Sequence, residues 1–327
     1  MPGVPKTMRA AAIDRFGGPE ELTLHTLPVP GIGPKELLIA VHTAGAASWD
    51  AEMRAGWWPE GKPEFPLVLG SDGSGTVARV GGQVRGFKMQ DEVYAYSFPN
   101  PKGGFYAEFV AVAAANVGHR PSRLNLEESG AIGTTGLTAL QGVERLGFRK
   151  RDPVVIVGAS GGVGTIAVQL ARWMGAHILA VASGRDGVRL VNELVGLNAS
   201  IDGKHEDVAE QVGSFAPDGI AAVLAFAGGE ALDACVDRVR PGGRVVHPNG
   251  VEPAPKRRSG VEIITYDAEA GPDHFKRLND AIDASRLKVA ISAAFPLEEA
   301  AKAHQRLASG HVIGKIVLHV RPAARTR

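Results

Sequence analysis

The segment from Val154 to Gly164 constrains the fold of this chain most. The apolar run Val154–Val157 predicts a buried strand, and the helical spacing of apolar residues after Gly162 predicts a helix behind a glycine turn. Glycines at 158, 161 and 164 form a variant of the G-x-G-x-x-G spacing, in the strand–turn–helix context that this motif requires. Such a turn lets a pyrophosphate approach the backbone and the unpaired N–H groups of the helix N-terminus. The sequence therefore predicts a dinucleotide site, with the cofactor in contact with Ser160, Gly161, Gly162 and Val163.

Alternating strand and helix patterns continue beyond this turn. Strands are expected at 153–157, 178–182, 220–226 and 244–247, with helices between them, which is typical of a parallel sheet with crossover helices. The first third instead has short strands broken by turns, and the chain closes on a strand at 315–320. We expect that strand to return to the β-rich part. Residues 1–125 and 265–327 would then form one domain, and residues 126–264 a nucleotide-binding domain.

The end of the second strand of this pattern bears on the choice of cofactor. Sites that prefer NAD usually place Asp or Glu there, to bind the ribose 2′-hydroxyl. This chain has Ser183 and Arg185 instead, whose hydroxyl and guanidinium suit a 2′-phosphate. Asp186, one position later, is the main objection, and the alternative is that Arg185 is a solvated loop residue. The sequence favours NADPH over NADH, with Ser183 and Arg185 at the phosphate.

Composition excludes several classes of protein. Cys235 is the single cysteine, so an intramolecular disulfide and a multi-cysteine metal centre are impossible, and its apolar helix predicts a packed thiol. The 36 basic and 35 acidic residues nearly balance, which gives no support for a nucleic-acid partner. No apolar run reaches the roughly 18 residues that span a bilayer, and the first residues lack the apolar stretch of a secretory signal. A soluble cytoplasmic protein that binds no membrane is expected.

Several further motifs occur in order over some 300 residues. They are Phe16-Gly17-Gly18-Pro19-Glu20, Leu69–Val77, Gly86–Tyr94, Gly103–Phe109, Pro241-Gly242-Gly243-Arg244 and Ser309–Leu318. Together with the glycine turn, they resemble the medium-chain dehydrogenase/reductase superfamily and, within it, the zinc-independent, zeta-crystallin-like quinone oxidoreductases. The resemblance implies an α/β fold, in which a GroES-like β-rich catalytic domain joins a Rossmann domain with a doubly wound parallel sheet. The active site would lie in the cleft between them.

The resemblance also implies further cofactor contacts. Thr135 should lie beside the nicotinamide, although its hydroxyl could instead bond back to its own helical turn. Ala227 and Gly228 should pass close to the nicotinamide ribose, with a plain strand-to-helix turn as the alternative. Asn249 and Gly250 follow the next strand, at the sheet edge where open α/β sheets bind ligands.

The same resemblance bears on metal. Zinc-dependent members of the superfamily have ligands at positions that correspond here to Ala47, Ser71 and Ala131, none of which is a zinc ligand. We therefore expect no metal. Without a Lewis acid, removal of a hydride from an alcohol is difficult. What remains is hydride delivery from NADPH to an acceptor that is already electrophilic, a quinone or an α,β-unsaturated carbonyl compound.

Aromatic residues are the candidates for the acceptor site, and no catalytic residue is identified. Trp49, Trp57 and Tyr94, together with Trp58, could form an apolar mouth for a flat acceptor. The alternative is core packing for Trp49 and surface packing for the Trp57–Trp58 pair.

Other readings of the chain stay open. Relatives of similar architecture reduce acyl-carrier substrates, so an enoyl-thioester reductase is one alternative. A non-catalytic NADPH-binding sensor or structural paralogue is another, because polar residues usual in the family are missing, as at Ala47. Relatives pair the last Rossmann strand across a two-fold axis, which predicts a homodimer through the strand near 261–265. The basic run Lys256-Arg257-Arg258 is expected to be a solvated loop.

Overall fold

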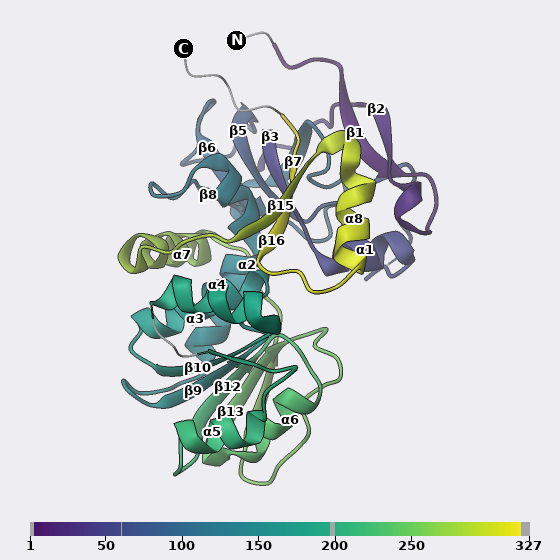
Figure 1. The fold of residues 1–327 in the computed structure, drawn as a ribbon. Coiled ribbons are helices and arrows are strands. Elements are labelled where there is room, and N and C mark those ends of the chain that lie inside the picture. The colour runs from purple at the N-terminus through teal and green to yellow at the C-terminus, as the bar shows by residue number, and fades with distance from the viewer. Residues whose placement is uncertain (1–2, 60, 197–199, 322–327) are drawn as a thin grey trace.

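The computed structural model describes residues 3–59, 61–196 and 200–321, which form two lobes (Figure 1). The lower lobe in that view is built on a parallel six-stranded sheet of order β11-β10-β9-β12-β13-β14. This is the strand order of dinucleotide-binding domains, with β9 as the first strand. The strands are β9 (Pro153–Val157), β10 (His177–Ala182), β11 (Ser200–Asp202), β12 (Ile220–Ala225), β13 (Val239–Pro248) and β14 (Glu262–Tyr266).

Helices cover both faces of this sheet, so its strands are apolar on both sides. Residues of β9 alternate between the two cores: Val154 and Ile156 pack with α3 (Gly162–Trp173) and α4 (Gly184–Val195). Val155 and Val157 pack with α5 (Val208–Phe215) and α6 (Glu230–Asp237). Cys235 on α6 is fully buried, and burial raises the pKa of its thiol to about 12, so the prediction of a packed thiol is confirmed.

The upper lobe is β-rich and mostly antiparallel. One sheet has the order β15-β16-β3-β5-β6-β8 with β7 paired to β3, and a smaller sheet has the order β2-β1-β4. Strand β16 pairs with β3, so the two ends of the chain share one sheet. The strands are β1 (Thr7–Ile13), β2 (Thr23–Pro28), β3 (Glu36–Ala46), β4 (Leu67–Val68), β5 (Asp72–Val80), β6 (Glu92–Tyr96), β7 (Phe109–Ala113), β8 (Val117–His119), β15 (Ile291–Pro296) and β16 (Lys315–His319).

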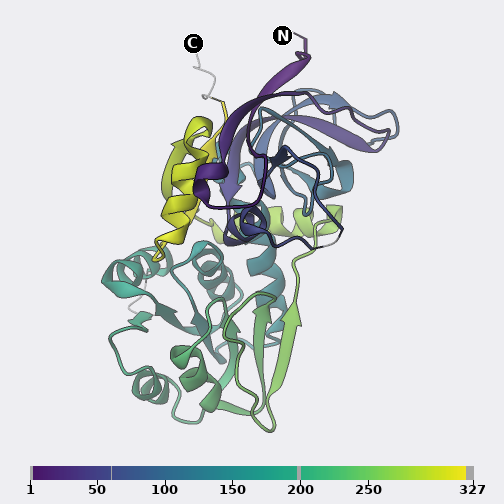
Figure 2. The same cartoon turned by 90° about the vertical axis from the view of Figure 1, so that its right-hand side faces the viewer.

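Two helices lie at the junction of the lobes, as Figure 2 shows. Helix α2 (Leu126–Arg145) begins with a capping box, in which Asn125 and Glu128 each accept the other's backbone N–H, and it packs on β3, β5 and β6 as well as on α3. Helix α7 (Pro272–Ser285) packs on α2, α3 and β8. Two further helices, α1 (Ser48–Ala55) and α8 (Ala300–Ala308), contact each other in the upper lobe.

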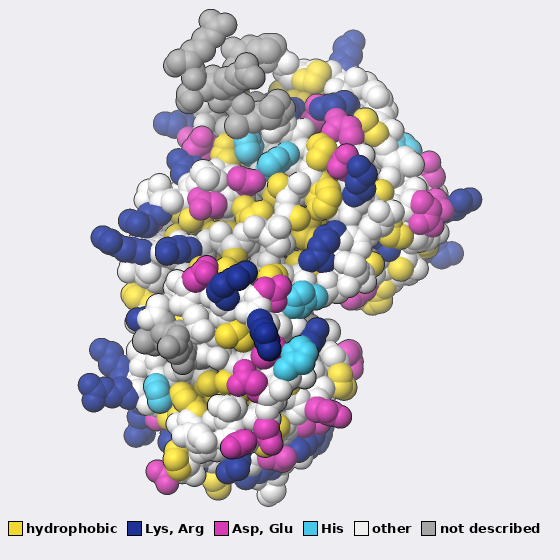
Figure 3. All heavy atoms as spheres, viewed as in Figure 1, with side chains coloured by type: hydrophobic (Ala, Val, Ile, Leu, Met, Phe, Trp, Pro, Cys, Tyr) yellow, Lys and Arg dark blue, Asp and Glu magenta, His cyan; other side chains and the backbone are white. Residues whose placement is uncertain are grey.

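The predicted fold class is confirmed, with differences in detail. Residues 297–308 form a 3₁₀ turn, η3 (Leu297–Glu299), followed by α8. Strand β15 has no counterpart among the predicted strands; it is half-exposed and depends on pairing with β16. In the space-filling view the surface narrows between the lobes, and each lobe carries side chains of both signs (Figure 3). Among the described residues, no helix has the length and apolar character needed to cross a bilayer.

Candidate functional site

The glycine turn after β9 leads directly into the N-terminus of α3. Gly158 has a φ of 75°, in the left-handed region that favours glycine, and a Cβ on Gly164 would overlap the carbonyl oxygen of Gly158. Gly161 caps α3 without any side-chain hydrogen bond, so the first N–H groups of the helix receive no acceptor from a cap residue. An uncapped helix N-terminus behind small residues fits the pyrophosphate of a dinucleotide.

Two neighbours hold this turn in place. The Ser160 hydroxyl oxygen accepts a hydrogen bond from the Ser183 N–H at 3.1 Å, and the Ser160 carbonyl accepts one from the Gly314 N–H at 2.8 Å. Gly161 and Gly314 also form a parallel β-bridge. Gly162 and Val163, in the first turn of α3, are half-buried. The C-terminal segment of the chain therefore touches the predicted cofactor loop directly.

The tip of the second strand brings a basic and an acidic residue together. Arg185 is exposed in the first turn of α4, while the Asp186 carboxylate lies 3.0 Å from Nε2 of His311. His311 also lies 3.3 Å from the Ser183 hydroxyl, and hydrogen bonding to His311 lowers the pKa of Asp186. The sequence prediction missed His311, although the Ser309–Leu318 motif contains it. The His311 side chain contacts the Asp186 carboxylate, the group that argues against a bound 2′-phosphate.

The residues expected near the nicotinamide lie on three elements. Thr135 on α2 donates its hydroxyl to the Ala131 carbonyl at 2.8 Å, which is the alternative stated for it. Its methyl carbon nevertheless faces the glycine turn, 3.4 Å from where a Cβ on Gly162 would lie. Ala227 is exposed, Gly228 is half-buried, and Gly250 is exposed with a φ of 82°.

Asn249 is exposed, and its side-chain amide donates to the Asp267 carboxylate at 2.6 Å. Asp267 is one of three carboxylates that add to burial in raising the pKa of Tyr96 to about 12, the others being Asp72 and Asp50. Tyr96 ends strand β6 in the opposite lobe. Asp50 and Asp72 belong to the same lobe as Tyr96, so Asp267 is the carboxylate of the three that acts on Tyr96 from the other lobe.

Trp49 lies beside Lys315 in the upper lobe and is held in a fixed orientation. Its indole N–H donates to the Ser71 hydroxyl at 2.8 Å, and that hydroxyl donates to the Asp50 carboxylate at 3.1 Å. The Lys315 ammonium lies 5.6 Å from the centre of the indole ring. The half-buried ring is thus fixed at its polar edge by a hydrogen bond.

Behind Trp49, a chain of buried hydrogen bonds runs from Asp50 to helix α8. Asp50 accepts from the Tyr106 hydroxyl at 3.3 Å, and the Tyr106 oxygen lies 3.1 Å from Nε2 of His304. Arg54 donates to Nδ1 of His304 at 2.8 Å, so Nε2 carries the ring proton and donates to Tyr106. Every member is buried. Sequence patterns do not reveal these hydrogen bonds, because their members come from three distant segments: helix α1, Tyr106 and helix α8.

A buried ion pair, which the sequence also did not predict, involves Lys315, whose side chain lies near both Trp49 and Gly162. The Lys315 ammonium is 3.7 Å from the Asp72 carboxylate, and both side chains are almost fully buried. The Lys315 side chain also reaches within 3.6 Å of where a Cβ on Gly162 would lie. The other carboxylate oxygen of Asp72 accepts the backbone N–H of Thr134 at 2.9 Å, which fixes the pair to α2. Lys315 therefore joins the upper lobe to the predicted cofactor loop.

The four aromatic residues proposed for the acceptor mouth have different surroundings in the structure. Trp57 is 49% exposed and stacks on Phe98 at 6.1 Å, while Trp58 is half-buried beside a small cavity that Ser71 and Phe98 also line. Tyr94 is a correction: it is fully buried and its hydroxyl donates to Asn279 on α7 at 2.8 Å. Tyr94 is therefore a core residue of the lobe junction, because the inward face of β6 packs on α7.

The positions that correspond to zinc ligands offer no ligand set. Ala47 and Ala131 are buried and have no donor atoms, and the Ser71 hydroxyl is engaged by Trp49 and Asp50. Among the described residues, no group of three or more His, Cys, Asp or Glu side chains is arranged to hold a metal ion.

The buried hydrogen bonds from Asp50 to His304 predict an unusual response of stability to pH. Burial raises the pKa of Asp50 from its ordinary 3.8 to about 6, and the Asp72 charge acts in the same direction. Burial, together with Arg54, lowers the pKa of His304 from 6.5 to about 3. As the pH falls from 6 to 4, the native Asp50 gains a proton that the unfolded chain does not, which stabilises the fold. Over the same range the unfolded His304 gains a proton that the native ring does not, which opposes it.

We predict that Asp50→Asn removes the first effect and leaves the second. The free energy of unfolding should then fall more steeply than in the wild type between about pH 6 and pH 4, by up to about 1.4 kcal/mol per pH unit. Urea unfolding at three pH values measures both slopes. Parallel curves for the wild type and Asp50→Asn would contradict the assignment of Asp50.

Comparison with known proteins bears on this geometry. Residues 33–122 match the alcohol dehydrogenase GroES-like domain, and residues 195–318 match a zinc-binding dehydrogenase domain. The chain is 30% identical to the quinone oxidoreductase of Mus musculus, over 96% of this chain and 98% of that protein. It is also 30% identical to 2-methylene-furan-3-one reductase of Solanum lycopersicum, over 98% of this chain and 81% of that protein.

Solved structures agree on the fold. A structure of an NAD-dependent alcohol dehydrogenase superposes with a TM-score of 0.88 at 30% identity, covering 96% of this chain and all of that one. A mycobacterial protein in complex with NADPH superposes with a TM-score of 0.82 at 26% identity, covering 95% of this chain and all of that one. One part of the chain matches a GroES-like domain, another matches a dehydrogenase domain, and the quinone oxidoreductase of Mus musculus aligns over nearly its full length. The chain is therefore an oxidoreductase. It belongs to the medium-chain dehydrogenase/reductase superfamily, as a quinone oxidoreductase-like member.

Proposed function

We propose that the protein is a zinc-independent, NADPH-dependent reductase that delivers a hydride to a quinone or an α,β-unsaturated carbonyl compound. The observation that carries this proposal is the juxtaposition of the uncapped glycine turn with Thr135 and Lys315 around Gly162, with Trp49 beyond Lys315. A nucleotide on the turn would bring its reactive end toward Trp49. The Mus musculus and Solanum lycopersicum relatives are named for a quinone and for an enone.

The residues of this chain would have separate tasks. The first turn of α3 would bind the pyrophosphate, and Ser183 with Arg185 would bind the 2′-phosphate. When bound, NADPH supplies the hydride. The fixed indole of Trp49 would orient a flat acceptor by stacking. Because Ala47, Ser71 and Ala131 provide no metal site, the acceptor itself must be electrophilic.

Cofactor choice is tested at Arg185, with Arg189 as a matched control. Both arginines are exposed on helix α4, one turn apart. We predict that the wild type prefers NADPH, and that Arg185→Ala raises the KM for NADPH about tenfold and leaves the KM for NADH unchanged, because a guanidinium–phosphate contact contributes roughly 1.4 kcal/mol or more. Arg189→Ala should change neither value. A wild type that prefers NADH would contradict the proposed 2′-phosphate site.

We also propose a homodimer through strand β14. This strand is the edge of the six-stranded sheet, and Ile263 and Ile264 on it are only half-buried. Pairing with a second copy would satisfy the backbone groups of that edge.

A further inference from the structure

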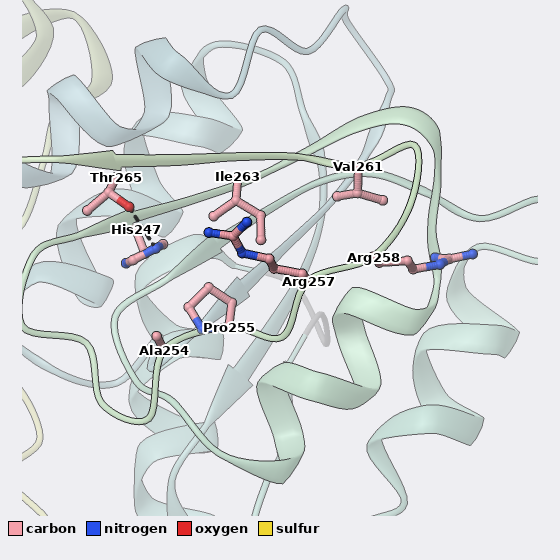
Figure 4. A pocket seen from close by; sticks show the side chains of 8 residues that line it. All are labelled: His247, Ala254, Pro255, Arg257, Arg258, Val261, Ile263 and Thr265. Carbon is pink, nitrogen blue, oxygen red and sulfur yellow. Dashed lines mark hydrogen bonds between the residues drawn. The ribbon is translucent and has the colours of Figure 1, made fainter.

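A cavity of about 500 Å³ lies between strands β13 and β14 and the loop of residues 250–260 (Figure 4). The strands contribute His247, Ile263 and Thr265, and the loop contributes Pro255, Arg257 and Arg258. None of the residues assigned above to cofactor or acceptor lines it. We propose that this cavity binds a small organic anion, with the acidic group on the Arg257 guanidinium and the apolar body against Ile263 and Pro255.

The charge of the cavity is one-sided. Two arginines line it and no lining residue is acidic. Arg258 is already engaged, since it donates to the carbonyl oxygens of Val236 at 3.0 Å and Val239 at 2.5 Å. Arg257 is exposed, and among the described residues no carboxylate lies within ion-pair distance of it. A guanidinium facing a cavity without a counterion suits a carboxylate or phosphate, which it can bind through two parallel N–H bonds.

The loop that covers the cavity is fixed to the rest of the lobe. Lys256 forms an ion pair with Asp237 of α6 at 2.6 Å, and the Gly260 carbonyl accepts the N–H of Gly242 at 2.7 Å. The Arg258 contacts with the end of α6 add a third attachment. The cavity therefore exists before a ligand arrives, which lowers the ordering cost of binding. Its volume falls within the range of roughly 300–1,000 Å³ that is usual for small-molecule sites.

The opposite end of the cavity offers an acceptor rather than a donor. Nδ1 of His247 lies 3.0 Å from the Pro248 carbonyl, which can only accept, so Nδ1 carries the proton of the neutral ring. Nε2 then accepts the hydroxyl proton of Thr265 at 3.1 Å. Neither side chain therefore has a free N–H or O–H group to donate to an anion. The acidic group must therefore bind at Arg257, whose side chain is directed along β14 toward His247 in Figure 4.

The probes are hexanoate and phenyl phosphate, which combine an apolar body with a carboxylate or a phosphate. Binding to the full chain is measured by isothermal titration calorimetry, with and without saturating NADPH. We expect at least one probe to bind in both conditions, and Arg257→Met to weaken it about tenfold or more. Lys256→Met removes a neighbouring charge that is paired outside the cavity, and it should change the affinity less than about twofold. Tighter binding of one probe shows which combination of acidic group and apolar body the cavity prefers.

Three results would overturn the proposal. The first is that neither probe binds at millimolar concentration. The second is that both variants weaken binding equally, which would show unspecific charge attraction. The third is that Arg257→Met converts a dimer into a monomer in sedimentation experiments, which would assign the cavity to the contact between two copies. All three outcomes are independent of cofactor turnover, so they can be distinguished from a failure of the proposed reductase function.

Discussion

Gly162→Asp is expected to abolish useful NADPH binding while the protein stays folded. Gly162 is the first residue of α3, and a Cβ there would come no closer than 3.4 Å to its neighbours, so an added Cβ is accommodated at ordinary contact distance. A carboxylate in the first helical turn stabilises the helix by roughly 0.3–1 kcal/mol. Beside a pyrophosphate the same carboxylate is repelled, by about 3 kcal/mol at 5 Å and an effective dielectric constant near 20.

The expected result is a loss of NADPH affinity of about 100-fold or more, measured by fluorescence titration. Gly162→Asn has nearly the same shape without the charge, and it should lose about tenfold or less. Urea unfolding should give both variants a stability equal to or above that of the wild type. Equal losses for Asp and Asn, or a retained affinity in Gly162→Asp, would mean that the phosphates do not bind at the N-terminus of α3.

Lys315→Met is expected to have the largest effect on stability. The substitution leaves the Asp72 carboxylate, which has no exposed surface, without the ammonium that lies 3.7 Å away. Breaking a buried ion pair by removing one partner costs about 3–5 kcal/mol, because the remaining charge is buried and uncompensated. Urea unfolding with an unchanged m-value measures this loss directly.

A double substitution separates charge from shape in this experiment. Lys315→Met with Asp72→Asn removes both charges, while the Asn side-chain oxygen can still accept the N–H of Thr134. The double variant should recover at least half of the stability that Lys315→Met loses. Lys302→Met is the matched control, because Lys302 is exposed and its partner Glu299 lies at the surface, so it should cost less than about 1 kcal/mol. A Lys315→Met variant as stable as this control would refute the buried pair.

The parts of the site that depend on local structure were predictable from the sequence. The glycine turn is one example, because a buried strand, a glycine spacing and a helix start follow each other within eleven residues. Strand β9 was predicted at the residues that the structure assigns to it. In both cases the controlling forces, backbone sterics and strand burial, act between neighbours in the chain.

The parts that depend on tertiary contacts were not predictable. His304 and Arg54 are 250 positions apart, and the contact of His311 with Asp186 joins residues 125 positions apart. No periodicity or motif relates such residues, since the sheet of the upper lobe is built from both ends of the chain. Tyr94 is an example of a wrong prediction from local sequence. It was expected to contact the acceptor, but on strand β6 its side chain points into the core and packs on Phe275. The aromatic pattern alone does not distinguish the two faces of that strand.

The central claim is hydride transfer from NADPH to an activated acceptor without metal. Its most direct test is NADPH oxidation by chelator-treated protein against quinones, 2-alkenals and enoyl thioesters, with simple alcohols assayed in the reverse direction. The account predicts turnover with quinones or 2-alkenals, unchanged by added zinc, and no alcohol oxidation. Turnover that requires zinc, reduction of enoyl thioesters alone, or tight NADPH binding with no turnover of any acceptor would contradict it.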